Sequence, residues 1–104
     1  MAWVYLFTAA LFEIGWAIGL KYSQGFTKLW PSVLTIIAMG ISLTFLALAV
    51  RTIPVGTGYA IWTGIGAVGT AILGILLFAE PLTAWRIISL LLIVGGVIGL
   101  KFSA

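Results

Sequence analysis

Apolar residues form four long runs along the chain, separated by short segments with charged and turn-forming residues. The runs cover residues 2–20, 29–50, 55–79 and 82–100. At 1.5 Å per residue, the first three span about 28 to 38 Å as α-helices, enough for a hydrocarbon core of roughly 30 Å. Because backbone groups in lipid must pair within their own segment, the pattern predicts one all-α domain, residues 1–104, with four transmembrane helices.

The fourth run is the least regular, because Arg86 interrupts it. Residues 87–100 alone span only about 21 Å. We therefore predict that this helix begins near Pro81, a residue suited to a first helical turn, and that Arg86 extends toward the lipid headgroups. Glu80 stands at the same helix start, where the helix dipole favours an acid, so we interpret it as structural.

Composition supports the membrane class and narrows the chemistry. The chain is 63% hydrophobic and only 7% charged, whereas soluble domains carry roughly 25% charged residues. Cysteine and histidine are both absent, which excludes disulfides, thiolate nucleophiles and histidine-based acid–base chemistry. We expect no metal site, no cofactor, no nucleic-acid partner and no enzymatic activity.

Basic residues divide almost evenly between the two sides of the membrane. Since successive helices alternate in direction, one side holds Arg51 and Lys101, and the other holds Lys21, Lys28 and Arg86. The positive-inside rule then gives almost no orientation. Two interpretations stay open: a cellular factor sets one orientation, or the chain inserts both ways and pairs as an antiparallel dimer that resembles an inverted repeat.

Four helices can enclose little space, so we expect an oligomer. In the fourth helix, Ser89 and Gly96 are seven residues apart on one stripe. Small residues let helix backbones approach closely in lipid. We predict a dimer contact at Ser89 and Gly96, with packing inside one chain as the alternative.

Glu13 is the one acidic or basic residue within the first apolar run. A charged carboxylate at this depth costs roughly 2.5 to 3.5 kcal/mol on insertion scales. Since no basic residue lies inside the apolar runs near it, Glu13 must be protonated, face a wet cavity or bind a cation. We predict that it binds both protons and a cationic substrate, a permanently neutral carboxyl being the alternative.

Aromatic and hydroxyl residues on three helices suit a cation site around Glu13. Trp16 follows it by three residues on the same helical face, Tyr59 and Trp62 share a face of the third helix, and Ser42 lies near the centre of the second. Ring faces attract cations and hydroxyls orient them. For Trp16 and Trp62, apolar packing is the alternative role.

Gly64 and Gly66 form the tightest glycine cluster after Trp62 in the third helix. Glycine pairs are common kink sites, so the cluster predicts a hinge beside the site. Close helix packing is an equally weighted alternative.

These features together resemble the small multidrug resistance family of proton-coupled exporters over the whole chain. The resemblance is carried by Glu13, "KYSQGFTKLWPS", "GYAIWTGIG" and the glycines of the fourth helix. It implies an antiparallel, dual-topology homodimer in the bacterial inner membrane. In such a dimer, two copies of Glu13 share one site and exchange protons for a cation.

Trp16, in "FEIGWAIGLK", resembles the guanidinium exporter subtype, because broader exporters of the family have glycine at that position. The resemblance implies a proton-coupled antiporter of guanidinium and small guanidinyl cations. A broader quaternary ammonium exporter is the alternative, and an accessory membrane subunit or pore former is a minor one. In the guanidinium subtype, the implied binding residues are Glu13, Trp16, Ser42, Tyr59 and Trp62.

Overall fold

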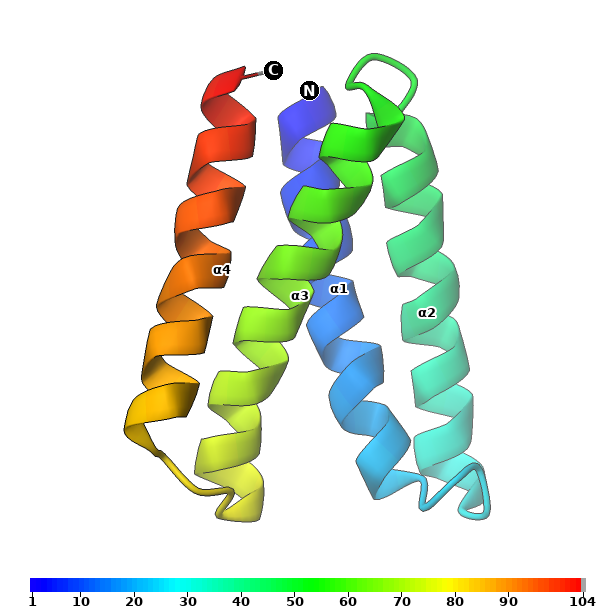
Figure 1. Ribbon diagram of the computed structural model, residues 1–104. Coiled ribbons are helices and arrows are strands. Elements are labelled where there is room, and N and C mark those ends of the chain that lie inside the picture. Colours follow the sequence, from blue (N-terminus) through cyan, green and yellow to red (C-terminus); the bar gives the residue numbers. More distant parts are fainter. Residues whose placement is uncertain (104) are drawn as a thin grey trace.

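The structure, a computed structural model, describes residues 1–103 as a bundle of four antiparallel helices (Figure 1). The helices are α1 (Ala2–Tyr22), α2 (Leu29–Ala49), α3 (Val55–Phe78) and α4 (Ala84–Ser103). Each is long and apolar enough to cross a membrane, which confirms the predicted all-α class with four spans. The start of α1, the α2–α3 linker and the end of α4 lie at one end of the bundle.

Helix packing is uneven across the bundle. α1 lies against α2 and α3, whereas the backbone of α4 lies close to α3 alone among the described helices. In Figure 1, α1 and α3 cross between α2 on one side and α4 on the other. The buried apolar core is made by Leu6, Ala9, Ala10, Ala49, Ile53, Ile61 and Trp62. These residues come from the first half of α1, the end of α2, the α2–α3 linker and the start of α3, so the core fills one end of the bundle.

The fourth helix begins at Ala84, later than the sequence pattern predicts. The backbone N–H of Arg86 donates a hydrogen bond to Thr83 Oγ1 at 3.2 Å, the arrangement of a helix N-cap. Pro81 therefore lies in the linker before α4, and the prediction that it belongs to the first helical turn is wrong.

Glu80 lies in the linker between α3 and α4, before the first residue of α4. Ala79 adopts a left-handed backbone conformation with φ 53°, and the backbone N–H of Glu80 donates to the Gly74 carbonyl at 3.3 Å. Glu80 forms an ion pair with Arg86. Each of the two side chains has the other as its partner, and both the helix-dipole explanation of Glu80 and the extension of Arg86 toward the lipid headgroups stay predictions.

Candidate functional site

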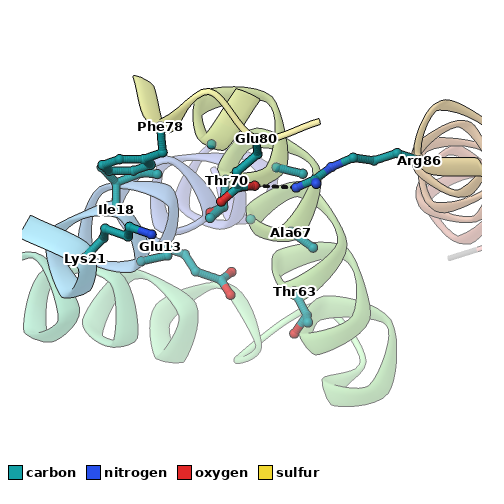
Figure 2. Close-up of a pocket in the computed structure, with 13 residues that line it drawn as sticks. Glu13, Ile18, Lys21, Thr63, Ala67, Thr70, Phe78, Glu80 and Arg86 are labelled. Carbon is teal, nitrogen blue, oxygen red and sulfur yellow. Dashed lines mark hydrogen bonds and ion pairs between the residues drawn. The ribbon is translucent and has the colours of Figure 1, made fainter. Parts of the chain in front are cut away.

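A cavity of about 410 Å³ lies between α1, α3 and the start of α4. Glu13 lines it from α1, near the middle of that helix (Figure 2). One face of α3 forms the opposite wall, and most residues of this wall are small or carry a hydroxyl. The α3 residues that line the cavity are Thr63, Gly66, Ala67, Thr70, Ala71, Gly74 and Phe78.

The carboxyl group of Glu13 lies directly against the backbone of α3. A β-carbon at Gly66 would overlap this carboxyl group, so glycine makes the approach possible. Glu13 Oε2 is buried and has no hydrogen-bond partner among residues 1–103. A buried polar atom without a partner costs free energy. Glu13 is therefore suited to bind a proton or a cation in this cavity.

Three further charged side chains line the same cavity: Lys21, Glu80 and Arg86. Glu80 and Arg86 pair with each other, and Figure 2 shows Arg86 extending from α4 to Glu80. Lys21 Nζ lies 5.2 Å from the ring centroid of Phe78, a cation–π distance. The cavity thus holds two acidic and two basic side chains, and within the described chain neither basic group forms an ion pair with Glu13.

A hydrogen-bond chain joins the three tightly packed helices beside the cavity. The indole N–H of Trp62 donates to Ser42 Oγ at 3.0 Å, and the Ser42 hydroxyl donates to the Ala9 carbonyl at 2.6 Å. Ala9 lies one turn before Glu13 on α1. The ring of Tyr59 lies 5.5 Å from that of Trp62, centroid to centroid, and 56% of Tyr59 is exposed. The structure therefore groups Ser42, Tyr59 and Trp62.

Trp16 lies about one turn after Glu13 on α1, and its buried indole N–H has no hydrogen-bond partner within the described residues. The residues that line the Glu13 cavity do not include Trp16, Ser42, Tyr59 or Trp62. Of the five predicted site residues, only Glu13 lines it. Convergence of all five on one site stays a prediction.

The two glycines predicted as a hinge lie at close helix contacts. A β-carbon at Gly64 would approach Val97 of α4 closely, and one at Gly66 would overlap Glu13. α3 is assigned as one helix through both positions. These contacts support the packing alternative, and the hinge stays a prediction.

The two residues predicted as a dimer contact, Ser89 and Gly96, are exposed on α4. No atom lies within 4 Å of a β-carbon built at Gly96, so this position is free of neighbours within the described chain. The dimer contact itself stays a prediction.

Sequence reasoning missed the hydroxyl residues of the cavity wall, Thr63 and Thr70. They are seven residues apart and so lie on one helical face. Thr70 Oγ1 is buried without a hydrogen-bond partner among residues 1–103. Hydroxyls at this spacing, alternating with Gly66 and Gly74 along an apolar helix, are the signal that could have identified this wall.

Comparison with known proteins places the chain in a family. The sequence model of the family described as Small Multidrug Resistance protein matches residues 1–93. The chain belongs to this family. Membership and the four spans make it a multi-pass transporter of the bacterial inner membrane.

Several curated relatives are similar over nearly the whole length. The guanidinium exporter of Citrobacter freundii is 59% identical over 103 residues, which cover 99% of this chain and 98% of the relative. The guanidinium exporter of Proteus vulgaris is 56% identical over 104 residues and covers all of both chains. That of Salmonella typhimurium strain LT2 is 59% identical over 104 residues, which cover 100% of this chain and 99% of the relative.

Proposed function

We propose that this chain is a proton-coupled antiporter that exports guanidinium and small guanidinyl cations by alternating access. The observation that carries the proposal is the carboxyl group of Glu13. It lies in a cavity between membrane-spanning helices, against Gly66, with a buried oxygen that no described residue satisfies. The guanidinium exporters with which the chain shares 56% to 59% of its residues support the choice of cation.

Coupling follows from the cost of an ionised acid in lipid. Glu13 without an occupant carries a charge that costs roughly 2.5 to 3.5 kcal/mol at membrane depth. A proton or a bound cation neutralises this charge, so both occupied states change conformation more easily than the empty ionised state. Since both occupants use the same carboxylate, one is released before the other binds, and the two move in opposite directions.

Selectivity is assigned to the aromatic and hydroxyl residues near Glu13. Trp16 offers a flat face to a planar guanidinium and reduces the room for larger cations. Ser42, Tyr59 and Trp62 would form the remaining wall, since they already lie together within one chain. We place all four in the substrate site of the assembled dimer.

The assembled unit is proposed to be an antiparallel homodimer of single-domain chains. Basic residues are nearly balanced between the two sides, and α4 buries none of its residues. Ser89 and Gly96 form the proposed contact. A single cysteine introduced into a linker should be labelled from both sides of the membrane in one preparation. Labelling from one side only would contradict dual topology.

One observation favours the broader quaternary ammonium exporter as a second candidate. The cavity of about 410 Å³ falls within the range of 300 to 1,000 Å³ that is typical of sites for drug-sized ligands. On this alternative, Trp16 would not limit substrate size, and the parent protein would carry a tetraphenyl cation as readily as guanidinium.

The deciding experiment measures proton movement driven by cation gradients in proteoliposomes. A guanidinium gradient should drive protons the opposite way, and a tetraphenyl cation gradient should drive few. Trp16→Gly should shift the preference toward the bulky cation and weaken the binding of guanidinium. The aromatic face that this substitution removes would contribute roughly 0.5 to 2 kcal/mol to guanidinium binding through a cation–π contact. Guanidinium flux without proton movement would contradict the antiport proposal and favour the pore alternative.

A further inference from the structure

The Glu13 cavity contains a second carboxylate whose place in transport is unassigned. Glu80 lies in the α3–α4 linker and lines the cavity together with Arg86. The Arg86 guanidinium donates a hydrogen bond to Glu80 Oε1 (Figure 2). The side chains of Arg86 and Glu80 keep 30% and 36% of their surfaces exposed. The pair is therefore partly buried but still open to exchange with a solute.

Both carboxyl groups lie against the same face of α3. A β-carbon at Gly66 would overlap the Glu13 carboxyl group, and one at Gly74 would come within 2.6 Å of Glu80 Oε1. The two glycines are eight residues apart, about 12 Å along the helix axis. Thr70 lies midway between them on this face, with a buried hydroxyl that no described residue satisfies. Along this face of α3 thus lie, in order, the inner carboxyl group of Glu13, the hydroxyl of Thr70 and the outer carboxyl group of Glu80.

The charge balance of the cavity limits how a cation can enter. Two acidic side chains face two basic ones, Lys21 and Arg86. A cation that bound without displacing either base would add an unbalanced charge. When Arg86 turns from Glu80 out of the cavity to solvent, where part of its side chain is already exposed, the charge of the cavity is unchanged, because one guanidinium then replaces another on the same carboxylate. Planar guanidinium groups match carboxylates through paired N–H donors, so the exchange preserves the contact geometry.

We propose that Glu80 is a second, outer binding subsite for guanidinium-type cations, which the Arg86 side chain occupies when no such cation is bound. Thr83 supports this arrangement, because it caps α4 at the turn that carries Arg86. The inference rests on the proposed function for the identity of the cation. Arg86 acts as a tethered competitor that an incoming guanidinium displaces before it reaches Glu13.

Transport kinetics test the competition directly. Removing the tethered guanidinium with Arg86→Gln should lower the KM for guanidinium by about threefold or more, because a larger fraction of Glu80 is then free. Glu80→Gln should raise the KM by a larger factor than it changes kcat. The double variant should behave like Glu80→Gln, since Arg86 then has no subsite to block. Arg86→Lys keeps the charge without the planar fork and should lower the KM less than Arg86→Gln does.

Two controls separate the subsite from a general charge effect. Lys28→Gln removes a positive charge at the same end of the bundle, from a residue that does not line the cavity, and should leave the KM near the parental value. Tetramethylammonium has the same charge as guanidinium but no N–H donors, so Arg86→Gln should change its KM less. Equal changes in Lys28→Gln and Arg86→Gln, or an unchanged KM in Arg86→Gln and Arg86→Lys, would overturn the proposal.

Calorimetric binding of guanidinium to the purified dimer distinguishes failure of this inference from failure of the proposed function. Glu13→Gln should retain weak guanidinium binding, and Glu13→Gln combined with Glu80→Gln should lose it. If these two variants bind alike, the outer subsite is wrong even where the parent exchanges guanidinium for protons. If the parent exchanges no guanidinium for protons, the antiport proposal fails, while the binding comparison still decides on Glu80.

Discussion

Helices α1 to α3 bury residues against one another, whereas α4 buries none of its own. The first three helices share a core and the Trp62–Ser42–Ala9 hydrogen-bond chain. α4 lies beside α3 and leaves Gly96 and most of its apolar side chains exposed. The difference indicates that one chain completes the scaffold around Glu13 but leaves α4 to be covered by lipid or by a second chain.

The substitution Glu13→Gln gives the strongest test of this comparison, because it should affect transport but not dimer formation. The substitution removes the shared carboxylate but touches no residue of α4. Guanidinium-driven proton flux in proteoliposomes should fall to the background of empty vesicles, while chemical cross-linking of the dimer stays parental. Flux at the parental rate would contradict a shared site.

The parent protein offers a matching pH test. Because protons and the cation compete for Glu13, the apparent affinity for guanidinium should weaken as the pH falls. An affinity that stays flat from about pH 6 to about pH 9 would count against competition for one carboxylate.

The next largest effect is expected on α4. Gly96→Leu places a bulky side chain on the stripe proposed to contact the second copy. Close approach of the helices is then blocked. Dimer association should weaken by about tenfold or more, equivalent to about 1.4 kcal/mol. Sedimentation in detergent would measure it.

Gly40→Leu on α2 is the matched control for this variant, since a β-carbon there also meets no atom within 4 Å. It should leave the dimer intact. If Gly40→Leu disrupts the dimer and Gly96→Leu does not, the contact lies on α2 instead.

An effect of at most the same size is expected where α3 supports the site. Gly66→Ala forces the Glu13 carboxyl group away from its place, so transport should fall by about tenfold, a cost near 1.4 kcal/mol. Gly15→Ala is the control, since a β-carbon there meets no atom within 4 Å, and this variant should transport at close to the parental rate.

Gly64→Ala separates the hinge and packing interpretations of Gly64 and Gly66. A hinge predicts equal losses at Gly64 and Gly66, whereas close packing predicts a mild effect at Gly64, because the Val97 methyl group can move.

The smallest expected effect is on the stability of the three-helix scaffold. Ser42→Ala removes the acceptor of the Trp62 indole N–H and should lower the free energy of unfolding by about 1 kcal/mol. Thr44→Ala, at a residue that bonds only to the Gly40 carbonyl on its own helix, should cost less. Reversible unfolding in mixed micelles would compare them. Equal losses would mean that the bond between helices contributes nothing of its own.

Much of the scaffold could be predicted from the sequence, because apolar runs of membrane-crossing length leave few alternatives to helices. Glu13 stood out for the same reason, as a lone acid in such a run. The start of α4 was misplaced because its signal is local and short: the helix begins after the Thr83 cap, although Pro81 is also suited to a first helical turn. The pairing of Glu80 with Arg86 depends on how a linker folds back, which no periodicity encodes.

The cavity wall was missed for another physical reason. Thr70 and Gly66 lie opposite Glu13 only because α3 is rotated by a particular amount about its own axis, and packing against α1 sets that rotation. The aromatic site residues show the reverse case. Ser42, Tyr59 and Trp62 were expected together and lie together, but none of them lines the cavity that contains Glu13.

The even number of helices constrains how an inverted pair could ever be encoded in one polypeptide. The start of α1 and the end of α4 lie at the same end of the bundle (Figure 1). A second copy joined to the first by a soluble tether would therefore begin on the side where the first copy ends, and both copies would point the same way. Gene fusion alone yields a parallel tandem, so an antiparallel version needs one added membrane crossing between the copies. For a bundle of this parity, independent synthesis of identical chains is the more direct route to inverted symmetry.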